Sequence, residues 1–207
     1  MNDVRVAFLE AAGALADLLG LRQVGDKWDD DSTLAGFTIG ALAGHAARGV
    51  LTVYWYLDMP EPDPPTITAA EYFAPHPSAF DTPVNVQVRE RGADTAKGGW
   101  ARLYLDVGRA VSHLEERLQT EPAEHRIPAL GKAILLDEYL RTRLVELVVH
   151  LGDLSRSLDL PTPELVAPAR FAIELLIDTA VERHGQAAVL HALARRELDT
   201  LEALKVL

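Results

Sequence analysis

Residues 134–158, ILLDEYLRTRLVELVVHLGDLSRSL, are the stretch that decides the fold. Apolar residues cover most of the circumference that this stretch would have as a helix, a pattern typical of a helix in the protein interior. Glu146, His150 and Asp153 interrupt the apolar run. At about 100° per residue, His150 lies roughly 40° to one side of Glu146 around the helix, and Asp153 lies roughly 20° to the other side of Glu146. The stretch therefore predicts a buried helix with one polar stripe, and a buried carboxylate needs a partner or a metal.

Similar helical periodicity predicts the neighbours of this helix. Earlier in the chain we expect helices over 3–19, about 36–58 and about 95–119. Beyond Pro161 and Pro163, which end the deciding helix, we expect two more, over about 163–183 and 186–203. The second of the early helices is rich in Ala and Gly, and such small residues let neighbouring helices approach closely.

The segments between these helices are harder to predict. Residues 59–83 hold most of the prolines and indicate a long, partly irregular connection. Residues 84–92 alternate polar and apolar side chains, which suits a short strand or the first turns of a helix equally well. Residues 120–134 predict a loop with room for a short extended piece. The order of elements predicts an all-α fold, a four-helix bundle with a long crossover connection and extra C-terminal helices.

We expect residues 1–160 to form the bundle and residues 161–207 to form a helical extension packed on it. The 207-residue chain has no cysteine, which excludes disulfides, thiolate metal ligands and a cysteine nucleophile. Its formal net charge of −11, without any basic run, argues against binding to nucleic acid or to an anionic membrane. No signal peptide or membrane span is evident, so we expect a cytoplasmic protein. The Ala-rich helices are compatible with a homodimer.

His45 lies on the apolar side of the helix predicted over 36–58. A lone histidine there is more often a hydrogen-bonded core residue, and Glu146 with His150 is a common i, i+4 pair. All three residues in apolar surroundings, on helices that should be neighbours, favour a metal site more strongly. Two imidazoles and one carboxylate suit Zn²⁺, which we prefer, or Ni²⁺, Mn²⁺ or Fe²⁺, and leave positions open for water or substrate.

Two neighbouring residues have two interpretations each. Arg143, one turn before Glu146, is a candidate for binding a carboxylate of a substrate or cofactor, or for a simple ion pair. Asp153 is a candidate for orienting a ligand histidine, or for capping backbone groups near Gly152.

The stretch LAGFTIGALAGHAARGVL, residues 34–51, resembles the first signature region of mycothiol-dependent maleylpyruvate isomerase-like proteins, with Phe37 in place of the usual Trp. The stretch YLRTRLVELVVHLGDLSRSLDLP resembles their second signature, R-x-x-E-x-x-x-H-x-x-D-L. The resemblance covers about residues 5–160 and implies a DinB-like four-helix bundle. It also implies that His45, Glu146 and His150 are the metal ligands.

The resemblance further implies a low-molecular-weight thiol, such as mycothiol, as cofactor or co-substrate. The metal would bind the thiol sulfur and lower its pKa. We therefore expect a metal- and thiol-dependent transferase or isomerase that acts on a small electrophile. A metal-dependent hydrolase, a non-catalytic metal-binding bundle and a bundle with no metal are the alternatives. Many relatives carry a sterol-carrier-like C-terminal domain, whereas this chain has about 45 further residues that look helical.

Overall fold

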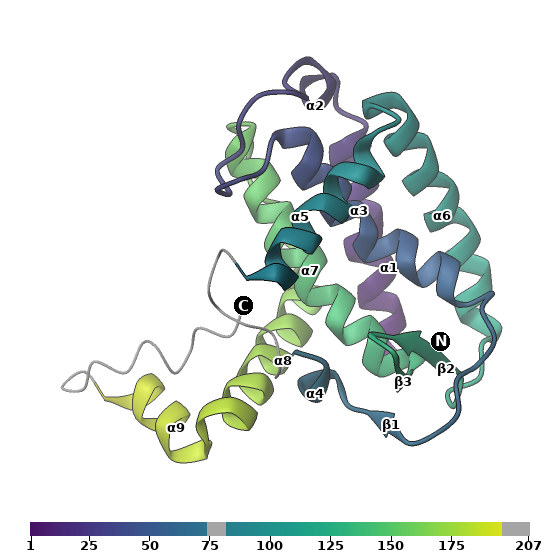
Figure 1. Ribbon diagram of the computed structural model, residues 1–207, viewed down its shortest axis with the longest axis vertical. Helices are drawn as coiled ribbons and strands as arrows, with labels where there is room; N and C mark the ends of the chain where they lie inside the picture. Colours follow the sequence, from purple (N-terminus) through teal and green to yellow (C-terminus); the bar gives the residue numbers. More distant parts are fainter. Residues whose placement is uncertain (74–81, 196–207) are drawn as a thin grey trace.

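A computed structural model describes residues 1–73 and 82–195 of the chain. Four long helices pack side by side and form a bundle (Figure 1): α1 (Asp3–Leu19), α3 (Ile39–Tyr56), α6 (Trp100–Thr120) and α7 (Leu136–Ser157). The stretch that decides the fold is α7, which packs against both α1 and α3. The predicted all-α bundle is confirmed, with the addition of a small sheet.

Side-chain caps determine where two of the bundle helices begin. Asn2 accepts a hydrogen bond from the backbone N–H of Arg5 and starts α1, whose bounds agree with the prediction. Thr38 accepts from the N–H of Ala41, so α3 begins at Ile39 rather than at residue 36. A short helix, α2 (Arg22–Asp26), follows α1 and was not predicted.

The long connection after α3 contains more regular structure than its prolines suggested. Within it lie β1 (Thr66–Ile67) and α4 (Ala69–Phe73), and residues 74–81 lie outside the described part of the chain. Residues 84–92, which could have been strand or helix, belong to the helix α5 (Pro83–Ala96), which Thr82 caps. The next helix begins at Trp100 rather than at residue 95, because Gly99 has φ +78° and stands before its first turn.

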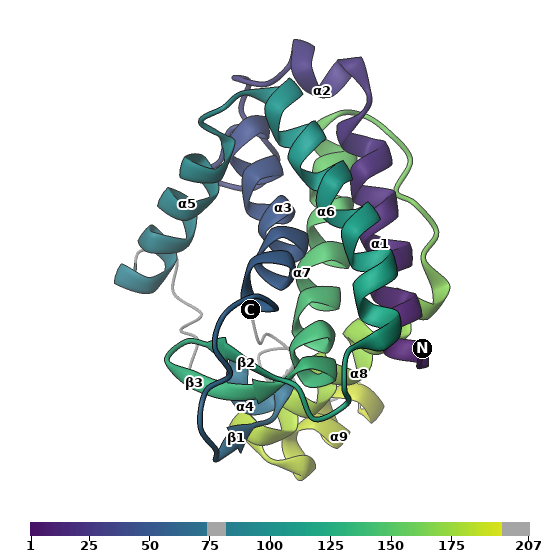
Figure 2. The ribbon, with the colours of Figure 1, turned by 90° about the vertical axis from the view of Figure 1, so that its right-hand side faces the viewer.

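The loop predicted over 120–134 contains a β-hairpin. Strand β2 (Arg126–Ala129) pairs antiparallel with β3 (Lys132–Leu135), and β1 pairs parallel with β3 on the other side. Leu130 and Gly131 form the two-residue turn, both with positive φ, as a type I′ turn requires. The sheet lies at the end of the bundle where α7 begins (Figure 2).

Beyond the bundle, α8 (Val166–His184) packs against α7 and α4, and α9 (Gln186–Ala194) follows it. The last predicted helix extended to residue 203, and its residues 196–203 lie outside the described part. The alanines that suggested a homodimer are largely buried inside the protomer, so they offer no flat outer face, and the dimer stays a prediction. None of the described helices is long and apolar enough to cross a membrane.

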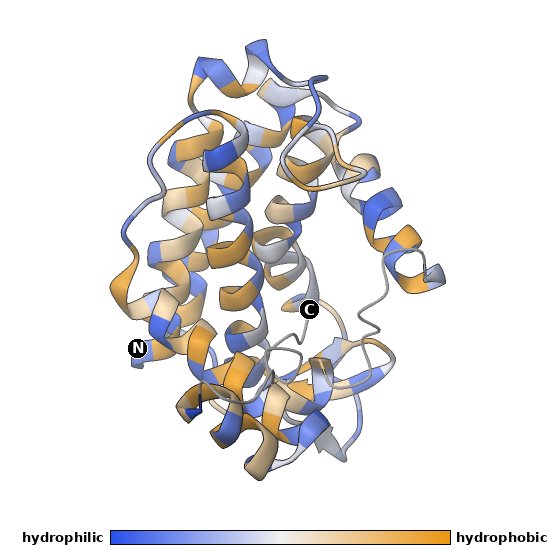
Figure 3. Ribbon diagram, turned by 90° about the vertical axis from the view of Figure 1, so that its left-hand side faces the viewer, coloured by the Kyte–Doolittle hydropathy of each residue, from blue (hydrophilic) through white to orange (hydrophobic). Residues whose placement is uncertain are grey.

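Helix α5 packs closely on α3 and stands apart from α1 (Figure 2). The two backbones meet at Gly44 and Gly92, where a Cβ atom added to Gly44 would overlap the carbonyl oxygen of Gly92. At the right-hand edge of Figure 3, α5 shows both hydrophilic and hydrophobic residues along its length, and its buried residues are Gly92 and Ala96. This contact brings α5 beside His45, since a Cβ at Gly92 would lie 3.0 Å from the Cβ of His45.

Candidate metal centre

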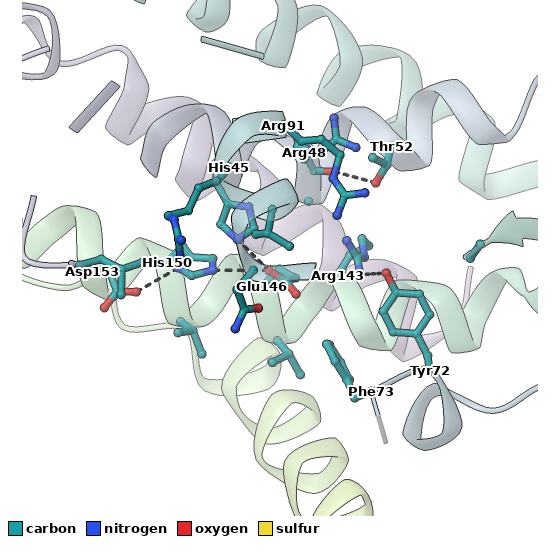
Figure 4. Close-up of a pocket in the computed structure, with 18 of the residues that line it drawn as sticks. His45, Arg48, Thr52, Tyr72, Phe73, Arg91, Arg143, Glu146, His150 and Asp153 are labelled. Carbon is teal, nitrogen blue, oxygen red and sulfur yellow. Dashed lines mark hydrogen bonds and ion pairs between the residues drawn. The ribbon is translucent and has the colours of Figure 1, made fainter. Parts of the chain in front are cut away.

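His45, Glu146 and His150 converge between α3 and α7 (Figure 4). His45 projects from the middle of α3, and Glu146 and His150 project from successive turns of α7. The Oε2 atom of Glu146 lies 3.4 Å from Nε2 of His45 and 3.4 Å from Nε2 of His150. The sequence had nominated these three residues, and the fold brings them together.

The spacing of these donor atoms suits a divalent cation. One ligand atom from each residue lies within 4.8 Å of the other two. Two atoms bound at about 2.1 Å from one ion in tetrahedral geometry stand about 3.4 Å apart, as both histidine–glutamate pairs do here. The side chains are 15%, 19% and 13% exposed for His45, Glu146 and His150, so an ion held there would be largely shielded from bulk water.

Asp153 lies beside His150 on α7, as the polar stripe predicted. Its Oδ2 is 3.0 Å from Nδ1 of His150, and its Oδ1 accepts a hydrogen bond from Arg156. A carboxylate on Nδ1 fixes the orientation of the ring and leaves Nε2 facing the other two donors. Both contacts are made to side chains and not to backbone groups near Gly152, so they favour the first of the two interpretations of Asp153.

The charges of the cluster balance without a metal. Burial alone would raise the pKa of Glu146, but the contacts with His150 and His45 outweigh it and hold that pKa well below its usual value. Burial would lower the pKa of His150, yet hydrogen bonding to Asp153 and Glu146 raises it to about 9. Burial dominates at His45 and lowers its pKa. At neutral pH the cluster therefore holds an anionic Glu146 between a neutral His45 and a cationic His150.

The three residues line a cavity of about 560 Å³. Apolar side chains form part of its wall, among them Phe37, Phe73 and Val149. Phe37, which stands where the resembling family has Trp, lies with its ring centroid 5.7 Å from that of His45. A space of this size admits a small organic molecule beside the donor cluster.

Arg143 lines the same cavity, but it does not form the ion pair that was one of its two interpretations. No carboxylate in the described residues forms an ion pair with it. Its Nη2 donates to the hydroxyl of Tyr72 (3.1 Å), and its guanidinium lies 4.8 Å from the ring centre of Tyr139. The neighbouring tyrosines and Glu146 outweigh its burial and raise the pKa of Arg143, so it keeps its charge. Tyr139 in turn donates to Thr52.

Several residues of the cavity were not predicted from the sequence. Arg48 follows His45 by three positions and shares its side of α3, which was a usable signal. Arg91 belongs to α5, whose secondary structure the sequence left open. Tyr72 belongs to α4, inside the segment that was predicted to be irregular.

Comparison with protein families supports the architecture seen in the structure. The family model described as mycothiol maleylpyruvate isomerase N-terminal domain matches residues 8–155, which include all three residues of the donor cluster. Comparisons with curated proteins and with solved structures give no match. The family is DinB-like, metal-binding and mycothiol-related. Because the match covers well over half of the chain, this protein belongs to the mycothiol maleylpyruvate isomerase N-terminal domain family.

Proposed function

We propose that this protein is a metal-dependent enzyme that uses a low-molecular-weight thiol, such as mycothiol, in transfer to or isomerisation of a small electrophile. The convergence of His45, Glu146 and His150 on the wall of a cavity carries the proposal. Membership of a mycothiol-related family supports the thiol. A purely structural metal would be closed off by protein ligands, whereas this cluster borders a space of about 560 Å³.

The donor set fits a divalent metal of the borderline class. Two imidazole nitrogens and one carboxylate oxygen would hold it, with Zn²⁺ preferred over Ni²⁺, Mn²⁺ or Fe²⁺. When bound, the ion would supply Lewis acidity that lowers the pKa of a coordinated thiol and makes thiolate available at neutral pH.

The protein's own groups orient and charge the site. Asp153 holds the His150 ring so that Nε2 faces the cavity. Arg143 presents a permanent positive charge from the same helix, held by Tyr72 and Tyr139, and suits a carboxylate of the thiol or of the electrophile. The apolar wall around Phe37 and Val149 excludes water from one side of the bound reactants.

We further propose that residues 1–160 form the metal-binding unit and that residues 161–207 form an extension packed on it. Ala172 and Leu175 of α8 are buried in one cluster with Val145 of α7 and Phe73 of α4. Through Val145 and Phe73, which also line the cavity, the extension supports the wall of the site from outside.

The first test is metal content, measured by elemental mass spectrometry on protein purified without chelator or metal-affinity tag. We expect about one equivalent of metal per chain in the wild type and none in a His45→Ala/His150→Ala variant. A His191→Ala variant serves as the control, because His191 lies exposed on α9, away from the cluster. Absence of metal in the wild type, even after incubation with Zn²⁺, Ni²⁺ or Mn²⁺, would refute the metal centre.

The second test separates the reaction classes on metal-loaded protein. Consumption of an electrophile such as chlorodinitrobenzene should require both added mycothiol and the intact cluster. Hydrolysis of an activated ester without any thiol would identify a hydrolase instead. A bound metal with neither activity would indicate a non-catalytic site.

A further inference from the structure

Four arginines line the cavity: Arg48 from α3, Arg89 and Arg91 from α5, and Arg143 from α7, of which Figure 4 labels Arg48, Arg91 and Arg143. Among the residues that the structure describes, no carboxylate forms an ion pair with Arg48, Arg91 or Arg143. Arginines elsewhere in the chain do have acidic partners, for example Arg5, Arg102, Arg117, Arg141, Arg156 and Arg170. The contrast is sharp in a protein with a net charge of −11.

Contacts with neighbouring side chains explain the buried position of Arg143 but not the position of Arg48. The guanidinium of Arg143 stacks on Tyr139 and donates to Tyr72, so it has a structural role in the core. Arg48, which is half-buried, has within the described part of the chain a 3.5 Å hydrogen bond to Thr95 and a contact at 6.0 Å with the ring of Trp55. These contacts leave most of its five N–H groups unused.

The electrostatics of Arg48 are unfavourable in the ligand-free protein. Burial lowers the pKa of Arg48, and the nearby charges of Arg91 and Arg143 lower it further. Like charges that approach each other without a counterion destabilise the folded state. An anion within the cavity would satisfy the unused donors and remove this repulsion.

We propose that Arg48, with Arg91 at the rim of the cavity, binds an oxyanion group, carboxylate or phosphate, of a small organic substrate. The assignment rests on the proposed function, because Arg48 follows His45 by one helical turn and so directs the anionic group to the neighbourhood of the donor cluster. The substrate class is then a small organic anion whose reactive end faces His45, Glu146 and His150.

The test is calorimetric titration of the full chain with succinate and, separately, with inorganic phosphate, at constant ionic strength. We expect saturable binding of at least one anion, with the tighter one identifying the group. Arg48→Gln should weaken it by about tenfold to a hundredfold, the range for a lost charge-assisted hydrogen bond. Arg48→Lys keeps the charge but not the planar fork, so it should retain part of the affinity. Arg91→Gln should have a smaller effect, because this residue is exposed.

Two controls make the result specific. Arg22→Gln changes the net charge equally at a side chain that is 87% exposed on α2, and it should bind like the wild type. Thermal unfolding of ligand-free Arg48→Gln should occur at the wild-type temperature or above, since repulsion is relieved; a large decrease would identify a structural arginine and overturn the proposal.

The titration also separates this proposal from that of the metal centre. Anion binding should persist in the His45→Ala/His150→Ala variant, whatever the metal content of the wild type. Binding that disappears in that variant but survives in Arg48→Gln would assign the anion to the metal centre and overturn the proposal. The absence of saturable binding of both anions up to about 10 mM would also overturn it.

Discussion

Replacement of Gly44 by alanine tests the close contact between the backbones of α3 and α5. Gly44 immediately precedes His45, and its missing side chain lets the backbone of α5 approach α3. An added Cβ would overlap the carbonyl oxygen of Gly92 and would lie 3.0 Å from both the N and the Cβ of Ala96. Two of these three atoms are backbone atoms, so no side-chain rotation can remove the conflict, and α5 has to move.

The size of the effect follows from two opposing contributions. Replacing glycine by alanine inside a helix stabilises it by about 1 kcal/mol, because glycine loses more backbone entropy on folding. Overpacking costs about 1–3 kcal/mol. The Gly44→Ala variant should therefore lose up to about 2 kcal/mol of unfolding free energy. Gly108 lies within α6 and has no neighbour within 4 Å of an added Cβ, so Gly108→Ala should gain up to about 1 kcal/mol.

The assay is urea unfolding of both variants, followed by far-ultraviolet circular dichroism. We expect the two free energies of unfolding to differ by about 1–3 kcal/mol, with Gly108→Ala the more stable. The comparison cancels the propensity difference between glycine and alanine, so what remains is the conflict at Gly92. A Gly44→Ala protein as stable as Gly108→Ala would refute the close approach of α5 to α3.

Three further predictions concern the cluster, the bundle and the core. Asp153→Asn should weaken Zn²⁺ binding by about tenfold to a hundredfold in competition titrations, because the partner that orients His150 is lost; unchanged affinity would count against that role. Arg5→Ala should lower the urea-derived stability by about 3–5 kcal/mol, because the backbone carbonyls of Leu118 and Glu121 lose this donor and Asp137 loses its cationic partner while keeping the hydrogen bond from Asn2. Burial raises the pKa of Tyr139 from 10.0 to about 12, so its neutral hydroxyl contributes fully to the free energy of unfolding below pH 10. This contribution should fall by about 2–3 kcal/mol as the pH approaches 12. Unfolding measured at each pH should show no such loss in a Tyr139→Phe variant.

The sequence predicted those parts of the site that lie on strongly periodic helices. The polar stripe of α7 could be recognised because its surroundings are apolar. The geometry of a single helix is enough to bring Glu146, His150 and Asp153 onto one side. His45 could be added because α3 has a continuous apolar face. The face on which each residue lies follows from the periodicity of its own helix, and the joining of His45 to the other two required in addition that the two helices be neighbours.

The parts that escaped prediction depend on contacts between distant segments. The run VNVQVRERG within α5 alternates like a strand, and its helical state is consistent with the cap at Thr82 and the packing of Gly92 on α3. Arg91 could not be assigned to the cavity without that packing. The strand pairing of β1 with β3 joins residues about 67 positions apart, as the register of Thr66 with Ala133 shows, and no local pattern reports it.

The small residues of α3 link the fold to the chemistry of the site. Gly44 faces α5, and Gly49, just over one turn beyond His45, faces α7, where an added Cβ would lie 3.0 Å from Leu147. Larger side chains at either position would push one wall away from His45 and Arg48. The 3.4 Å separation between His45 and Glu146 requires α3 and α7 to be close, and the approach of Arg91 to Arg48 requires α5 to be close. The low side-chain volume of α3 is therefore a condition for both the donor cluster and the arginine-lined wall: alanine at Gly49 should perturb the approach of α7, and alanine at Gly44 the approach of α5.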